Sequence, residues 1–63
     1  MEESEIYFLA WAYADMMKIE TRQRAVELAG EGDLYEQVAL DRWHEWEEKH
    51  DQIVKAMIVK GYI

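Results

Sequence analysis

Helix-breaking residues are rare in this 63-residue chain, and their positions limit the fold more than any other feature. Proline does not occur, and the three glycines lie at positions 30, 32 and 61. Proline and glycine are the residues that most often interrupt helices, so a segment without them can continue for many turns. The sequence Gly30-Glu31-Gly32 is therefore the one internal break, and it divides the chain into two segments of similar length.

The residues around this break have the features of helix ends. Gly30 suits the left-handed position that follows a helix, and Asp33 suits the N-cap of the next helix. Glu36, three residues after Asp33, completes an aspartate version of the capping box. We therefore expect a single all-α domain, an antiparallel helical hairpin over residues 1–63. Its parts are a helix at about 3–29, a loop at 30–33, and a helix at about 34–60 that Gly61 ends.

Each expected helix has a series of residues spaced alternately by four and three, the spacing that brings side chains to one face. In the second helix the series is Ala39, Trp43, Trp46, His50, Ile53 and Met57. In the first helix it is Leu9, Ala12, Met16, Ile19, Gln23 and Val26, with Phe8 beside them. Antiparallel folding places Met16 near Trp46 and Ala12 near His50. We expect these two faces to pack against each other.

A nine-residue run, Ile6 to Ala14, carries no charge. A helix that is apolar on every side must be covered on every side, and one neighbouring helix covers only one face. With the Leu9 face assigned to the second helix, Tyr7, Trp11 and Ala14 are left uncovered. We therefore expect the hairpin to associate with itself, as a homodimeric four-helix bundle.

The composition excludes several classes of partner and chemistry. The net charge is −7, with 14 acidic and 7 basic residues, which disfavours direct binding to nucleic acid or to an anionic membrane. Cysteine is absent, and one serine and one threonine offer no nucleophile–base arrangement, so we do not expect an enzyme. Glu2, Glu3 and Glu5 replace the basic start of a signal peptide, and the uncharged run is too short to span a bilayer. We expect a cytoplasmic protein.

One motif suggests metal binding. Glu47 and His50 form a Glu-x-x-His pair, the spacing that ferritin-like di-iron bundles use to direct two ligands to one metal. Asp15 should lie at the same level of the hairpin, so a dimer would collect oxygen and imidazole ligands suited to iron or manganese. The simpler interpretation is that His50 packs between the helices and makes a hydrogen bond to Asp15 or to a backbone carbonyl. We favour this interpretation and expect no cofactor, with the di-metal bundle as the alternative.

The remaining candidates are residues that would contact another protein. Tyr7, Trp11 and Tyr13, together with Phe8, are of the residue types that dominate binding hot spots. The segment 31–51 holds eight acids and two bases. Within it, Asp41, Glu45 and Glu48 would offer charge to a basic partner.

These residues predict a small acidic regulator or inhibitor that acts by binding another protein. Its acidic face either mimics nucleic acid in the basic groove of an enzyme or only keeps the protein soluble. A structural subunit of a larger assembly is a further alternative.

Overall fold

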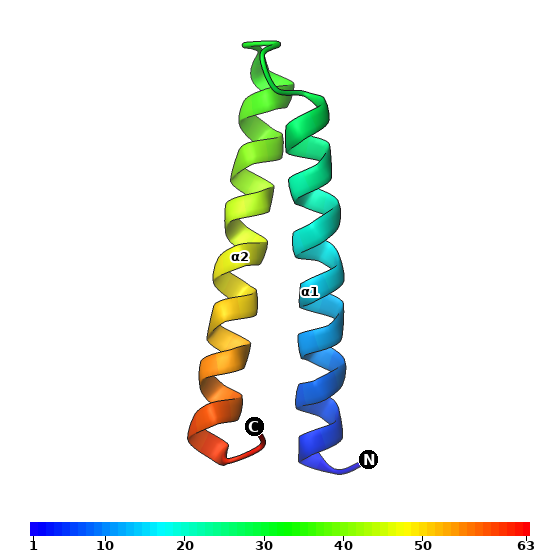
Figure 1. Cartoon of the computed structure of the whole chain (residues 1–63), viewed down its shortest axis with the longest axis vertical. Helices are drawn as coiled ribbons and strands as arrows, with labels where there is room; N and C mark the ends of the chain where they lie inside the picture. The colour runs from blue at the N-terminus through cyan, green and yellow to red at the C-terminus, as the bar shows by residue number, and fades with distance from the viewer.

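In the computed structural model, which describes residues 1–63, the chain folds into two antiparallel α-helices joined by a short loop. Helix α1 spans Glu3–Glu27 and helix α2 spans Leu34–Lys60, so both termini lie at the same end of the molecule (Figure 1). The hairpin measures 44 × 18 × 14 Å. Its accessible surface is 4840 Å², against about 4,300 Å² expected for a compact monomer of 7.6 kDa. The predicted all-α hairpin is confirmed, and neither helix has an apolar stretch long enough to cross a membrane.

Helix α1 is continuous through its polar second half. Thr21 lies within the helix, and its hydroxyl donates a hydrogen bond to the carbonyl oxygen of Met17, one turn earlier, at 2.7 Å. The helix ends at Glu27, two residues before the predicted end at Ala29. The chain then turns through Gly30, whose φ of 88° is the left-handed conformation that the sequence predicted.

Helix α2 begins at the predicted cap. The Asp33 carboxylate accepts a hydrogen bond from the backbone N–H of Glu36 at 3.1 Å. In a capping box the Glu36 carboxylate would accept a hydrogen bond from the backbone N–H of Asp33. Here it accepts one from the N–H of Gly32, one residue earlier. Two backbone donors at the helix start are still satisfied, so the loop is held by both side chains.

Helix α2 ends in a Schellman motif centred on Gly61, whose φ is 79°. The N–H of Gly61 donates to the carbonyl of Ile58 at 3.1 Å, and the N–H of Tyr62 donates to that of Met57 at 2.9 Å. This turn sends Tyr62 back toward α1, where its ring lies 5.6 Å from the ring of Tyr7.

The two helices meet through faces of unequal side-chain size. The predicted face of α2 is confirmed, since each of its six residues is buried or half-buried in the hairpin. The face that α1 turns toward them is built largely from small residues and comprises Tyr7, Ala10, Ala14, Met17, Thr21, Ala25 and Leu28. Only four residues of the chain are fully buried, namely Ala14, Ala25, Ala39 and Met57. We call these two sets the interhelical faces.

Candidate interaction surface

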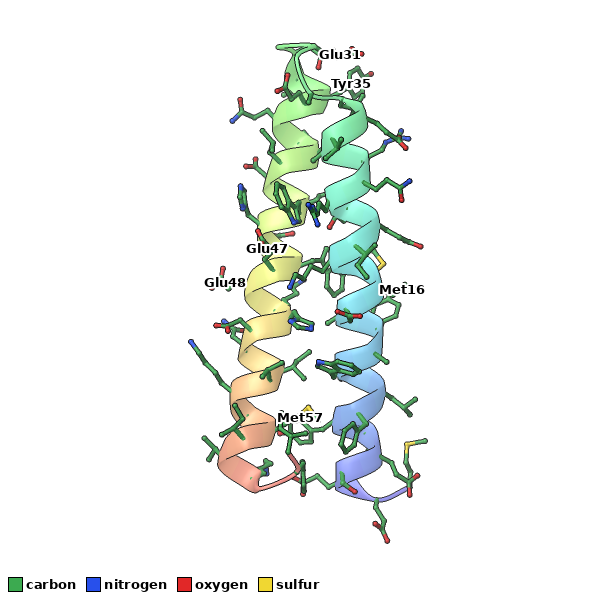
Figure 2. All side chains as sticks on the ribbon, in the orientation of Figure 1. Met16, Glu31, Tyr35, Glu47, Glu48 and Met57 are labelled. Atoms are coloured by element: carbon green, nitrogen blue, oxygen red, sulfur yellow. The ribbon has the colours of Figure 1, made fainter.

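The large apolar side chains of α1 point away from α2. Leu9 and Ile19 are each 58 % exposed, whereas Ala14 is 1 % exposed. In Figure 2, Met16 lies on the side of α1 remote from α2, while Met57 lies between the helices. The exposed residues recur at helical spacing and form a single strip, which we call the outer stripe: Phe8, Leu9, Ala12, Met16, Ile19 and Val26.

This arrangement corrects the predicted packing of α1. Leu9, Ala12, Met16, Ile19, Gln23 and Val26 were expected between the helices, and all six are exposed. The predicted register is nearly right, since the ring opposite His50 belongs to Trp11, one residue from Ala12. The rotation of α1 about its axis is wrong by about half a turn. Ala14, predicted to be uncovered, is buried in its place.

The physical reason for the rotation lies in α2. Trp43, Trp46 and His50 are bulky, so the space between the helices accommodates them only where the facing helix has small side chains. Ala10, Ala14 and Ala25 supply those small side chains at heptad-like spacing. This alanine series was the signal in the sequence that identifies the interhelical face, but the larger apolar residues on the opposite face were the more conspicuous pattern.

The predicted aromatic anchors are spread around α1 and do not form one cluster. Tyr7 belongs to the interhelical face and contacts Tyr62. Trp11 is 38 % exposed, and its ring lies 6.2 Å from that of His50. Tyr13 is 54 % exposed and meets Trp46 edge-on at 5.6 Å.

Trp11 and Tyr13 lie on opposite flanks of α1, since residues two positions apart in the sequence are separated by about 200° around a helix. Both are partly covered by α2, so they border the outer stripe and do not lie at its centre.

The predicted acidic face of α2 is exposed. Asp41, Glu45 and Glu48 recur at spacings of four and three on the side of α2 remote from α1, and the Glu48 side chain points outward in Figure 2. Neither Asp41 nor Glu45 has an ion-pair partner within the hairpin. Lys49, four residues after Glu45 on the same helix, lies over the Trp46 ring at 4.6 Å. The carboxylates of Asp41 and Glu45 are therefore unpaired within the hairpin, and that of Glu48 accepts a hydrogen bond only from the exposed Gln52.

The candidate metal ligands are only partly brought together. His50 packs between the helices as the simpler interpretation predicted, and its Nε2 lies 3.5 Å from a carboxylate oxygen of Asp15, but the predicted hydrogen bond is not formed. Glu47 points elsewhere, and its carboxylate contacts Nδ1 of His44 at 3.2 Å. The hairpin holds no group of three or more His, Asp or Glu side chains that are arranged to bind a metal ion.

A polar cluster joins the helices at the end where the termini meet. Lys60 makes an ion pair with Glu3 and lies 5.5 Å from the centre of the Tyr7 ring. A hydrogen bond from Lys60, with a smaller one from the Tyr62 hydroxyl, lowers the pKa of the Glu3 carboxyl. Desolvation, followed by the hydrogen bond to Glu3, raises the pKa of Tyr62. This cluster connects the helix ends and offers no reactive group.

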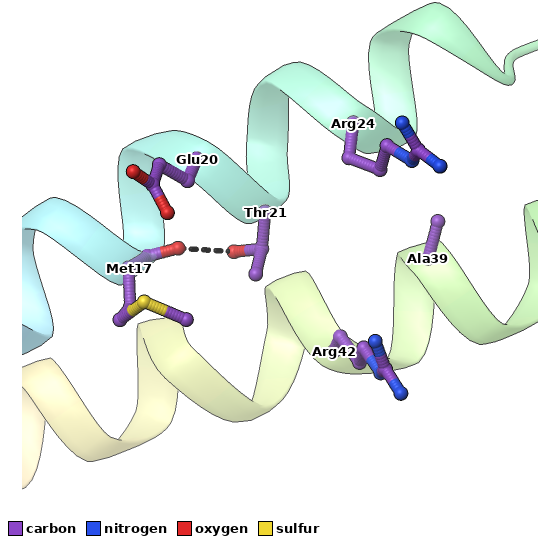
Figure 3. Close-up of a pocket in the computed structure, with 6 residues that line it drawn as sticks. All are labelled: Met17, Glu20, Thr21, Arg24, Ala39 and Arg42. Carbon is purple, nitrogen blue, oxygen red and sulfur yellow. Dashed lines mark hydrogen bonds between the residues drawn. The ribbon is translucent and has the colours of Figure 1, made fainter.

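A shallow groove of about 200 Å³ lies across the helices near the buried Ala39 (Figure 3). Arg24 and Arg42 border it from the two helices, and the carboxylate of Glu20 shares it. Arg24 also lies 3.9 Å from Glu27. The groove thus mixes both signs of charge and does not form a basic site for an anion.

Comparisons with protein-family models, with curated proteins and with solved structures find no match for this chain. The hairpin and its surfaces are therefore the basis on which a function is assigned. They define a two-helix module with one apolar outer face and one acidic outer face.

Proposed function

We propose that the chain is a small protein-interaction module, acting as a regulator or inhibitor, with the outer stripe of α1 as its contact surface. The observation that carries the proposal is the exposure of six apolar residues in one strip, four of them large aliphatic residues and one an aromatic. Contiguous apolar patches of this kind on a small protein are typical of binding sites, because leaving them in water is unfavourable. A hairpin with four buried residues has no interior in which to place them.

The acidic face of α2 supports binding to a basic protein. It lies on the opposite side of the molecule from the outer stripe, so one face can remain available while the other is covered. A basic partner, such as an enzyme with a groove for nucleic acid, would be attracted by Asp41, Glu45 and Glu48 over distances near the Debye length. In this function the outer stripe is an apolar contact surface, and the acidic face is a second surface that attracts a basic partner.

Affinity capture with matched variants tests this proposal. Ile19→Glu introduces a charge in the outer stripe, and Val59→Glu introduces the same charge at an exposed valine on the outer side of α2. We expect proteins captured by the wild type to be retained by Val59→Glu and lost with Ile19→Glu. Replacing Asp41, Glu45 and Glu48 with their amides should reduce capture and make it less sensitive to salt. Equal capture by Ile19→Glu and the wild type would contradict the proposal.

A further inference from the structure

We infer that a second copy of the chain covers the outer stripe, with α1 of one protomer packed antiparallel against α1 of the other. This pairing depends on the proposed role of the stripe as a contact surface, and it adds the identity and the orientation of one partner. The stripe follows α1 and keeps a heptad-like spacing from Leu9 to Val26. Such a strip is complementary to another helix with the same spacing.

Antiparallel pairing places complementary residues in each layer. When Met16 faces Ile19 of the second copy, Leu9 faces Val26 and Ala12 faces Gln23, and the two-fold symmetry repeats each pair. Met16 and Ile19 then pack in the middle of the interface, and Leu9 and Val26 pack toward its ends. Between them, small Ala12 lies beside the longer Gln23. A two-fold axis generates this arrangement from one chain, and two-fold dimers are the commonest homo-oligomers.

The charges of α1 favour the antiparallel orientation over the parallel one. From Glu2 to Asp15, α1 and its N-cap contain four acids and no base, whereas Lys18, Arg22 and Arg24 all lie in the second half. A parallel pair would bring Glu5, which lies in line with the stripe, against its own copy. An antiparallel pair instead brings Asp15 toward Arg22 of the other chain. Arg22 has no ion-pair partner inside the hairpin, so it is free to make this contact.

The position of the stripe also sets the shape of the dimer. Because the stripe lies opposite the interhelical face, the two α1 helices would form the centre and the two α2 helices the outside. Four helices would then lie in a row, in contrast to the four-helix bundle that the sequence predicted. Both acidic faces of α2 would remain exposed, which keeps them available to a basic partner.

Sedimentation equilibrium on the purified full chain tests the association. We expect a dimer of the 7.6 kDa chain for the wild type and for Val59→Glu. In Ile19→Glu, two unpaired carboxylates would enter the interface and weaken association on the order of 100-fold. Circular dichroism checks that both variants keep the helical content of the wild type. A wild type that is monomeric at tens of micromolar would overturn the inference.

Cysteine cross-linking tests the orientation, since the chain has no native cysteine. In the antiparallel pair the two copies of residue 9 lie roughly 25 Å apart along the helix, at about 1.5 Å per residue. We therefore expect a mixture of Met16→Cys and Ile19→Cys to form a disulfide-linked mixed dimer under mild oxidation, and Leu9→Cys alone to form none. A mixture of Leu9→Cys and Val26→Cys should form the mixed dimer. Efficient self-linking of Leu9→Cys would indicate the parallel arrangement and overturn the inference.

The two proposals fail in different ways. A monomeric wild type whose captured proteins are still lost on Ile19→Glu would overturn the dimer and leave the interaction module in place. If the wild type and the variant with amides at Asp41, Glu45 and Glu48 both form dimers and neither captures a protein, the second copy is supported as the occupant of the stripe. The proposed function as a regulator would then be contradicted. If Ile19→Glu keeps both self-association and the captured proteins, the dimer and the proposed function would both be contradicted.

Discussion

The outer faces of the two helices differ more than their inner faces do. Outside, α1 presents Leu9, Met16 and Ile19, whereas α2 presents Asp41, Glu45 and Glu48. The middle of helix α2 is amphipathic, with one apolar and one charged side. Helix α1 is apolar on two opposite sides, small residues inward and large ones outward. A helix that buries small side chains and exposes large ones has a second surface to cover, which is why we propose α1 as the binding helix.

The largest expected effect is on the free energy of unfolding, and it distinguishes a methionine between the helices from one on the outer stripe. Met57 is 1 % exposed between the helices, and Met16 is 46 % exposed on the outer stripe. Met57→Ala removes a buried side chain and should lower the free energy of unfolding by about 2–4 kcal/mol. Met16→Ala should change it by less than about 0.5 kcal/mol. Urea unfolding monitored by circular dichroism measures both.

These two variants are best made in the Ile19→Glu chain, so that self-association does not contribute to the unfolding free energy. A similar loss of stability from both substitutions would mean that Met16 is packed within the hairpin. The distinction between the inner and outer sides of α1 would then be lost.

A second contrast uses two alanines of α1 only two residues apart. Ala14 lies on the interhelical face and is almost fully buried, while Ala12 is exposed on the outer stripe. Ala14→Leu should force the helices apart and destabilise the hairpin by about 1–3 kcal/mol. Ala12→Leu should leave the hairpin within about 0.5 kcal/mol of its original stability. The opposite order would restore the packing predicted from the sequence.

The two helices also differ in how well the sequence predicted them. For α2, the cap at Asp33, the end at Gly61 and the interhelical face all followed from the residues, because one apolar series had no competitor. For α1, two series fitted a helix equally well, and hydrophobicity alone favoured the larger side chains. The correct choice depended on size complementarity with Trp43 and Trp46, which is a property of the pair and not of α1 alone.

The candidate sites show the same limitation. The exposure of Asp41, Glu45 and Glu48 followed from their position opposite the apolar face of α2. The metal candidates were separated by side-chain orientation, since Glu47 turns toward His44 and not toward His50. The contact between Tyr7 and Tyr62 was not predicted, because it depends on the backward turn at Gly61.

The smallest expected effect is on the pH dependence of stability, and it concerns the polar cluster where the two helix ends meet. The test compares two acids in the first turn of α1. Glu3 reaches Lys60 across the hairpin, whereas Glu5 has no partner on α2. Because the folded pKa of Glu3 is lowered from its ordinary value of 4.5, its contribution to stability is present above that value. The contribution is lost as the pH falls through the lowered pKa.

Glu3→Gln should therefore reduce the dependence of the unfolding free energy on pH on the acidic side of 4.5, and Glu5→Gln should reduce it less. On the alkaline side, the same ion pair raises the pKa of Lys60 above 10.5, so its contribution should disappear as the pH rises through that raised value. Thermal unfolding at a series of pH values, followed by circular dichroism, measures both limbs. Since all these groups are exposed, salt should diminish the difference between the two variants. Identical pH profiles for Glu3→Gln and Glu5→Gln at low salt would show that the cross-helix pair does not stabilise the hairpin, and that the helix ends are held by the aromatic contact between Tyr7 and Tyr62.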